Sequence, residues 1–188
     1  MIIVTDCDGV LLSWFHSFEW WMKRKGYKAV TISYDVSEQY DISKKHATDL
    51  VEIFCESAAI GYLPPLKDAI KYVRKLHEER GAVFHCITSI GTDPYAIKLR
   101  EQNLNRVFGE TVFERIHCLP CGAGKTEALE RYRDSDFVWV EDKLENANIG
   151  AEMGLRSFLI DHPYNRTGVP HYAVTRVDNW EEIYNHIA

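Results

Sequence analysis

Two aspartates near the start of the chain, Asp6 and Asp8, have the residue type and the spacing for acid chemistry. They follow a short apolar run at residues 2–4 that is typical of a buried strand. Alternate residues of an extended segment point to the same side, so both carboxylates can face one point beyond the strand's end. Gly9 then permits a sharp backbone turn. Two like charges this close need a cation, a shared proton or solvent, so these residues indicate either a functional site or a solvated acidic turn.

Other polar residues also follow apolar segments of the chain. Thr88 and Ser89 end one such segment, Glu141 and Asp142 end another, and Lys125 precedes an expected helix. The carboxyl ends of parallel strands lie at one edge of a sheet, so these groups can converge there. Phosphoryl transfer needs a nucleophile, oxygen ligands for Mg²⁺ and a cation for the phosphoryl oxygens. The combination favours that chemistry.

The elements that would position these groups alternate between strand and helix after residue 81. Expected strands lie at residues 82–88, 115–118, 137–140 and 155–160, and expected helices begin near residues 93, 125, 142 and 179. Such alternation predicts an α/β fold with a mostly parallel sheet that helices cover on both faces. Residues 14–80 hold helical patterns and no convincing strand, so we expect a helical insertion after the first strand.

Composition and charge exclude several classes of protein. A hydrophobic content of 46% over 188 residues is enough for a full core, and the net charge of -6 argues against a nucleic-acid polymer or an anionic membrane as partner. No segment approaches the roughly 18 apolar residues that span a bilayer. The five cysteines are scattered along the chain, which fits a reducing cytosol, so we expect a cytoplasmic protein.

A cysteine pair and one histidine are weaker candidates for a functional role. Cys118 and Cys121 have the spacing of half a zinc site or of a redox pair, but no second CxxC or histidine pair follows, so we favour neither use. His162, in a loop after the last expected strand, is a candidate substrate contact.

Four short motifs resemble, in order along the chain, those of the haloacid dehalogenase superfamily of phosphohydrolases: Asp6-Cys7-Asp8-Gly9-Val10, Thr88-Ser89, Lys125 and Glu141-Asp142-x3-Asn146. The resemblance implies a Rossmann-like three-layer α/β/α core made of residues 1–13 and 81–188. It also implies a small helical cap, residues 14–80, inserted after the first strand.

The resemblance implies a role for each of these residues. Asp6 would be the nucleophile that becomes an aspartyl-phosphate, and Asp8 the acid and base that moves protons. Thr88 and Ser89 would bind the phosphoryl group, and Lys125 would neutralise its charge. The carboxylate at position 8 is similar to the phosphatase branch of the superfamily, because dehalogenases lack that acid.

The same resemblance implies a Mg²⁺ site. Asp6, the backbone carbonyl of Asp8, and Asp142 would hold the ion. Glu141 and Asn146 would support these ligands, with Glu141 as an alternative direct ligand.

Within the superfamily, Asp6-x-Asp-Gly-Val-Leu, the aromatic Trp14, the Ile-Thr-Ser-Ile turn and the 161–166 loop are similar to 5′(3′)-deoxyribonucleotidases and their bacterial and phage relatives. In those proteins cap aromatics stack on the base, and stacking is worth about 1–3 kcal/mol. Trp14 would take that role, whereas the neighbouring rings would pack the cap. We therefore expect a Mg²⁺-dependent phosphomonoester hydrolase acting on a small phosphorylated metabolite, such as a (deoxy)nucleoside 5′-monophosphate.

Three other functions are alternatives to this expectation. Residues 122–126 partly match the phosphate-binding loop of a nucleotide kinase, but Leu119 is present where that motif requires glycine. A phospho-receiver domain has its lysine after its acids, whereas Glu141 and Asp142 follow Lys125 here. A binding or regulatory module on the same fold, without turnover, is the third alternative.

Overall fold

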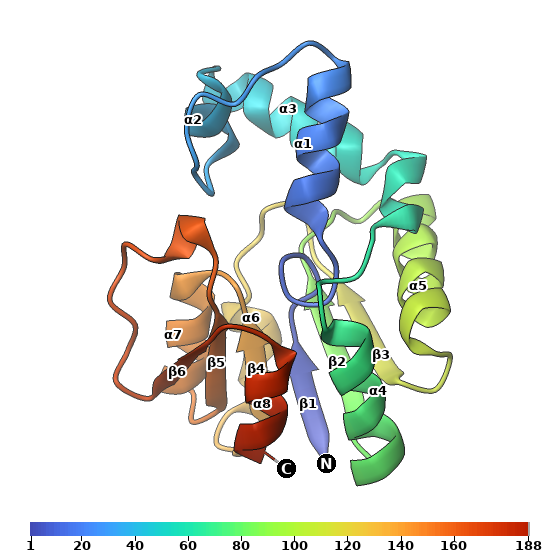
Figure 1. Cartoon of the computed structure of the whole chain (residues 1–188), viewed down its shortest axis with the longest axis vertical. Coiled ribbons are helices and arrows are strands. Elements are labelled where there is room, and N and C mark those ends of the chain that lie inside the picture. The colour runs from blue at the N-terminus through green and yellow to red at the C-terminus, as the bar shows by residue number, and fades with distance from the viewer. Residues whose placement is uncertain (188) are drawn as a thin grey trace.

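A single parallel sheet organises residues 1–187, the part of the chain that this computed structural model describes (Figure 1). Within that range its six strands lie in the order β3-β2-β1-β4-β5-β6, and all neighbouring pairs are parallel. They are β1 (Ile2–Thr5), β2 (Val83–Thr88), β3 (Phe113–Cys118), β4 (Val138–Glu141), β5 (Arg156–Ile160) and β6 (Val174–Val177). Strand β1 is therefore central, and the chain crosses to each side of it in turn.

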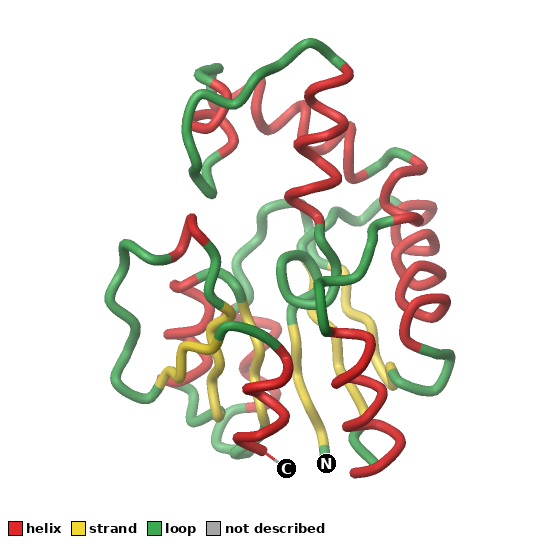
Figure 2. The backbone as a smooth tube through the Cα atoms, in the orientation of Figure 1, coloured by secondary structure: helices red, strands yellow, loops and turns green. Residues whose placement is uncertain are grey.

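Helices connect these strands and cover both faces of the sheet (Figure 2). Between β1 and β2 come α1 (Trp14–Arg24), α2 (Val36–Tyr40), α3 (Lys44–Cys55), the 3-10 helix η1 (Ala58–Tyr62) and α4 (Ala69–Arg80). The later ones are α5 (Pro94–Phe108), α6 (Thr126–Leu129), η2 (Glu130–Tyr132), α7 (Leu144–Glu152), η3 (Pro163–Asn165) and α8 (Trp180–Ile187). Helices α4, α5 and α8 share one hydrophobic cluster with β1, whereas α6 packs in a second cluster.

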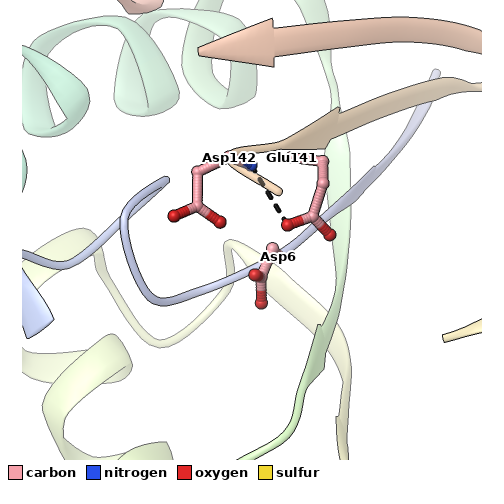
Figure 3. A group of neighbouring side chains, drawn as sticks. All are labelled: Asp6, Glu141 and Asp142. Carbon is pink, nitrogen blue, oxygen red and sulfur yellow. Dashed lines mark hydrogen bonds between the residues drawn. The ribbon is translucent and has the colours of Figure 1, made fainter. Parts of the chain in front are cut away.

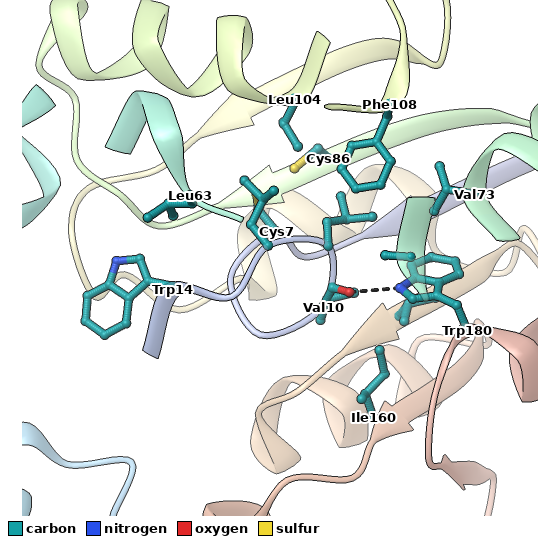
Figure 4. Packing of buried hydrophobic residues seen from close by; sticks show 14 of the residues in the cluster. Cys7, Val10, Trp14, Leu63, Val73, Cys86, Leu104, Phe108, Ile160 and Trp180 are labelled. Atoms are coloured by element: carbon teal, nitrogen blue, oxygen red, sulfur yellow. Dashed lines mark hydrogen bonds between the residues drawn. The ribbon is translucent and has the colours of Figure 1, made fainter. Parts of the chain in front are cut away.

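The loop after β1 packs against the hydrophobic core. Ile3 and Val4 are fully buried on the two faces of the sheet, as expected for a central parallel strand. Val10 is buried against α8, where the indole Nε1 of Trp180 donates a hydrogen bond of 2.8 Å to its carbonyl (Figure 4). The loop that carries the two N-terminal aspartates is thus part of the core and not a solvated turn.

Helices α1, α2 and α3 lie beyond the carboxyl ends of the strands, over the sheet edge (Figure 1). The predicted fold class, a Rossmann-like three-layer core with a helical cap inserted after the first strand, is confirmed. The division at residue 80 stays a prediction. Helix α4 contacts α5 and α8 beside the sheet, so we propose a shorter cap of residues 14–63.

Some elements differ from the sequence predictions. Strand β6 was not predicted because its sequence, Val-Thr-Arg-Val, is short and half polar at the sheet edge. Helix α2 lies in a stretch predicted as turns, where the side chain of Asp35 accepts a hydrogen bond from the backbone N–H of Ser37 and caps the helix. In the described part of the chain, no helix has the length and apolar character required to cross a membrane.

Candidate active site

Three buried carboxylates, Asp6, Glu141 and Asp142, meet at the carboxyl ends of the two central strands (Figure 3). One oxygen from each lies within 4.8 Å of the others. The parallel register of β1 and β4 pairs Thr5 with Val140, so the residues after each strand are neighbours. The convergence predicted from the sequence is therefore present at this edge.

Lys125 lies between two of these acids. Its ammonium Nζ is 2.6 Å from Asp6 Oδ2 and 2.9 Å from Glu141 Oε2, and the residue is only 3% exposed. It is the residue directly before the short helix α6. Glu141 also accepts hydrogen bonds through Oε1 from the backbone N–H groups of Asp142 and Lys143, which fixes its side chain.

Burial and charge shift the pKa values of this cluster. Desolvation and the neighbouring Glu141 raise the pKa of Asp6, against the opposing charge of Lys125. Desolvation also raises the pKa of Glu141, and it raises that of Asp142 to about 6. Burial by itself lowers the pKa of Lys125, but the ion pairs with Asp6 and Glu141 outweigh it and keep the ammonium charged. A cluster with more carboxylates than cations is one that a bound cation stabilises.

The loop after β5 contacts Asp142 and the turn that follows β1. The hydroxyl of Tyr164 donates to Asp142 Oδ2 at 2.5 Å, and Asn165 Nδ2 donates to the Asp142 carbonyl at 2.7 Å. His162 Nε2 lies 2.7 Å from the carbonyl oxygen of Gly9. The sequence predicts a substrate contact for His162 and no role for Tyr164, because a loop sequence does not show which strand end the loop will reach.

Gly9 is required by the close approach of these elements. Its φ of +77° lies in the left-handed region, and a Cβ on it would lie 2.2 Å from Asp142 Oδ2. The turn of the first motif and the acid of the last one are therefore in direct contact.

Asp8 has a partner that sequence reasoning missed. Arg100, on α5, donates from Nη2 to Asp8 Oδ2 at 2.9 Å, and its Nη1 lies 2.7 Å from Oδ1. A single arginine within an amphipathic helix carries no signal of such a contact, because the two residues are far apart in the sequence.

Thr88 and Ser89 take different positions at the end of β2. Among the described residues, no group hydrogen-bonds the buried Thr88 Oγ1. Ser89 lines the cavity described next, and its hydroxyl donates to the Ala123 carbonyl at 2.9 Å. Buried hydroxyls are normally hydrogen-bonded, so Thr88 Oγ1 retains an unused capacity for one, although the residue has no exposed surface.

A cavity of about 570 Å³ opens between the strand ends and the cap. The residues predicted for the site that line it are Asp6, Asp8, Trp14, Ser89, Lys125, Asp142 and Asn146. Thr88 and Glu141 are not among its lining residues. The cap contributes mainly apolar and aromatic side chains, including Phe15, Tyr34, Val36, Ala47 and Val51.

Trp14 both lines the cavity and packs within the cap. Its ring stacks on Phe18 at 4.6 Å with an interplanar angle of 15°, and meets Phe54 edge-on at 5.4 Å. One face of the indole is thus already covered by a neighbouring ring.

The donor set fits a hard divalent cation. Mg²⁺ prefers carboxylate and carbonyl oxygens, and the three carboxylates meet beside the cavity, which Asp6 and Asp142 line. Lys125 occupies the side between Asp6 Oδ2 and Glu141, which leaves Asp6 and Asp142 facing the cavity as the more accessible pair.

Comparison with known proteins gives distant relatives. No protein-family model matches the chain. It is 25% identical over 193 residues to an uncharacterised 32.4 kDa protein from the Gp30-rIII intergenic region of enterobacteria phage T4, covering 97% of this chain and 68% of that protein.

Several solved structures share the fold over nearly the whole length of both chains. CbbY from Rhodobacter sphaeroides, solved with phosphate, has a TM-score of 0.60 at 16% identity, covering 97% of this chain and 95% of CbbY. A D,D-heptose 1,7-bisphosphate phosphatase from Burkholderia thailandensis has a TM-score of 0.58 at 14% identity, covering 98% and 96% of the two chains. L-2-haloacid dehalogenases share the architecture too.

The chain therefore has the fold of the haloacid dehalogenase superfamily, as its four motifs predict. Because phosphatases and dehalogenases share this fold, the reaction must be argued from the site.

Proposed function

We propose that this protein is a phosphomonoester hydrolase that works through an aspartyl-phosphate on Asp6. The observation that carries the proposal is the convergence of Asp6, Lys125, Glu141 and Asp142 at the strand ends, beside a cavity that all of them except Glu141 line together with Asp8. A carboxylate two residues after the nucleophile supports phosphate ester hydrolysis over dehalogenation.

The residues support a two-step reaction. A carboxylate oxygen of Asp6 attacks phosphorus while the ester P–O bond breaks, and Asp8 gives a proton to the leaving oxygen. Water, which then loses a proton to Asp8, hydrolyses the acyl phosphate and regenerates Asp6. Lys125 balances negative charge on the transferring group, and Ser89, which lines the cavity, and the neighbouring Thr88 are the proposed hydroxyl contacts of that group.

Mg²⁺ is the cofactor that we propose for this site. Asp6, Asp142 and the backbone carbonyl of Asp8 would hold it, with Glu141 and Asn146 as supporting residues. When bound, such an ion reduces the repulsion between the phosphate and the carboxylates and polarises a phosphoryl oxygen.

The substrate in this proposal is a small phosphorylated metabolite, and a (deoxy)nucleoside 5′-monophosphate is the specific candidate. The cavity volume of about 570 Å³ suits a ligand of that size. Its mixed lining of carboxylates, lysines and aromatic rings suits a ligand with a charged and a flat apolar part.

The location that we propose is the cytoplasm. The five cysteines carry free thiols, which supports a reducing compartment.

The test is phosphate release from a panel of nucleotides, sugar phosphates and p-nitrophenyl phosphate with Mg²⁺ present. Asp6→Asn, which preserves the side-chain shape, should abolish release while the melting temperature shows a folded protein. An Asp6→Asn protein with unchanged turnover would refute the proposed nucleophile. A wild-type protein that releases phosphate from nothing in the panel would instead favour a binding module.

A further inference from the structure

Arg100 is a fully buried cation at the rear of the proposed site. Its two terminal nitrogens reach the two carboxylate oxygens of Asp8, at 2.7 and 2.9 Å, and Nη1 also donates to Cys7 Sγ at 2.8 Å. Only Oδ2 accepts a hydrogen bond from Arg100, and the ion pair of Nη1 with Oδ1 is the second contact, so the guanidinium restrains both the distance and the rotation of the carboxylate.

Asp8 contacts the buried Arg100 on one side and lines the cavity on the other. Its side chain is 22% exposed and lines the cavity, whereas that of Arg100 is 0% exposed. The ion pair therefore uses the side of the carboxylate that faces the core. Among the described residues none hydrogen-bonds Asp8 Oδ1, so this buried oxygen keeps lone pairs that can take a proton.

The helix that carries Arg100 is itself anchored at several points. Asp93 caps its first turn by accepting from the Ala96 N–H at 2.8 Å. Further along, Asn103 Nδ2 donates to the Leu63 carbonyl at 3.1 Å. Leu63 belongs to the segment by which the chain returns from the cap. The guanidinium thus projects from a rigid support.

We propose that Arg100 is a positioning residue that orients Asp8 for proton transfer. The inference rests on the proposed phosphatase function and deepens it, since it assigns a residue outside the four motifs to the same reaction. Arg100 does not line the cavity and acts only through Asp8.

A positioning role predicts a dependence on the leaving group. An alkyl phosphate needs a proton on its departing oxygen, whereas p-nitrophenolate departs without one. Arg100→Lys keeps the charge and loses the planar fork. We expect it to lower kcat/KM for an alkyl phosphate, such as a nucleotide, by roughly 100-fold, the size of effect that a displacement of about 1 Å can cause. For p-nitrophenyl phosphate we expect a loss several-fold smaller.

A double-mutant cycle with Asp8→Asn separates this role from general stability. If Arg100 acts through Asp8, then Arg100→Lys should change kcat/KM little in the Asp8→Asn background. Arg106→Lys is the matched control, because Arg106 lies on the same helix and donates to the Gly61 carbonyl away from the carboxylates. We expect the control to keep both activities.

The outcomes are distinct for the two proposals. No phosphate release by the wild-type protein refutes the proposed function itself. If the wild type is active, a folded Arg100→Lys variant with unchanged kcat/KM overturns the positioning role. An equal loss of kcat/KM for the alkyl phosphate and for p-nitrophenyl phosphate overturns it too. Both results leave the phosphatase proposal standing. Melting temperatures of all variants identify any loss that comes from unfolding, and Arg100→Gln provides a second substitution of the same site for comparison.

Discussion

The ammonium of Lys125 lies 2.6 Å from Asp6 Oδ2, and so the proposed nucleophile is paired with the cation that would also neutralise the phosphoryl group. The pair is buried, and Glu141 shares the lysine at 2.9 Å. Structure and reactivity at this corner therefore depend on the same ammonium.

Removing that ammonium should affect both. Lys125→Met leaves Asp6 and Glu141 buried without their cation, and breaking a buried pair typically costs about 3–5 kcal/mol. We expect a lower free energy of unfolding by denaturant titration and loss of phosphate release. Lys45→Met, which removes an exposed ion pair with Asp49 on α3, should leave both measurements unchanged. Equal stability of the two variants would contradict the structural part of this prediction.

The contact between Gly9 and Asp142 predicts a severe effect of one methyl group. Gly9→Ala would bring a Cβ to 2.2 Å from Asp142 Oδ2, so the acid or the turn must move. Gly26→Ala is the control, since Gly26 also has a positive φ, +90°, but nothing lies within 4 Å of its Cβ position. We expect Gly26→Ala to cost about 1–2 kcal/mol from backbone strain alone. Gly9→Ala should cost more and should abolish activity.

Metal binding should stabilise the protein only above a certain pH. Burial raises the pKa of Asp142 to about 6, from an ordinary value of 3.8. Between these values the folded state binds the extra proton, so the metal-free protein loses stability as the pH rises through this range. Mg²⁺ binds the ionised carboxylates and competes with protons. We expect Mg²⁺ to raise the melting temperature at about pH 7.5 and much less at about pH 5. The same increase at both values, or an undiminished one in Asp142→Asn, would contradict the assignment of the ion to this cluster.

Tyr164 should tune the metal site without binding the ion. Its hydroxyl donates to Asp142 Oδ2, and loss of such an orienting hydrogen bond typically lowers metal affinity about 10–100-fold. Tyr164→Phe should therefore weaken Mg²⁺ binding in a titration followed by calorimetry. Tyr172, which is 94% exposed, gives the control substitution Tyr172→Phe, with no change expected.

Trp14 provides the test of a nucleobase in the cap. If the indole stacks on a base, Trp14→Ala should raise KM for nucleotides much more than for p-nitrophenyl phosphate. Phe18→Leu perturbs the same aromatic stack from a residue that is not among the cavity-lining residues, and should change both KM values alike. A Trp14→Ala variant that behaves like Phe18→Leu would assign Trp14 to packing.

Much of the fold follows from local patterns in the sequence. The apolar runs that became β1, β2, β4 and β5 and the helical spacing between them specify a parallel sheet with its polar strand ends on one edge. Such patterns are strong because parallel strands that are buried on both faces consist largely of apolar residues. Strand β6 lies at the sheet edge, where a threonine and an arginine are tolerated, and its pattern is accordingly weak.

The candidate site could be predicted only where a residue belongs to a motif. Asp6, Lys125 and Asp142 are specified by order and by their position after a strand. Arg100 and Tyr164 reach the site through tertiary contacts, from the side of a helix and from a loop. Neither position differs in composition from an ordinary surface or packing residue, so the sequence alone does not reveal them.

The central position of β1 has a consequence for how the chain reaches its native state. Strand β1 is made first, but its neighbours β2 and β4 begin only at Val83 and Val138. Pairing across such sequence separations is entropically costly and slows folding. Strand β1, which Asp6 follows, therefore stays without its partner β4 until residues 138–141 have been synthesised, and an unpaired strand edge favours aggregation during that interval.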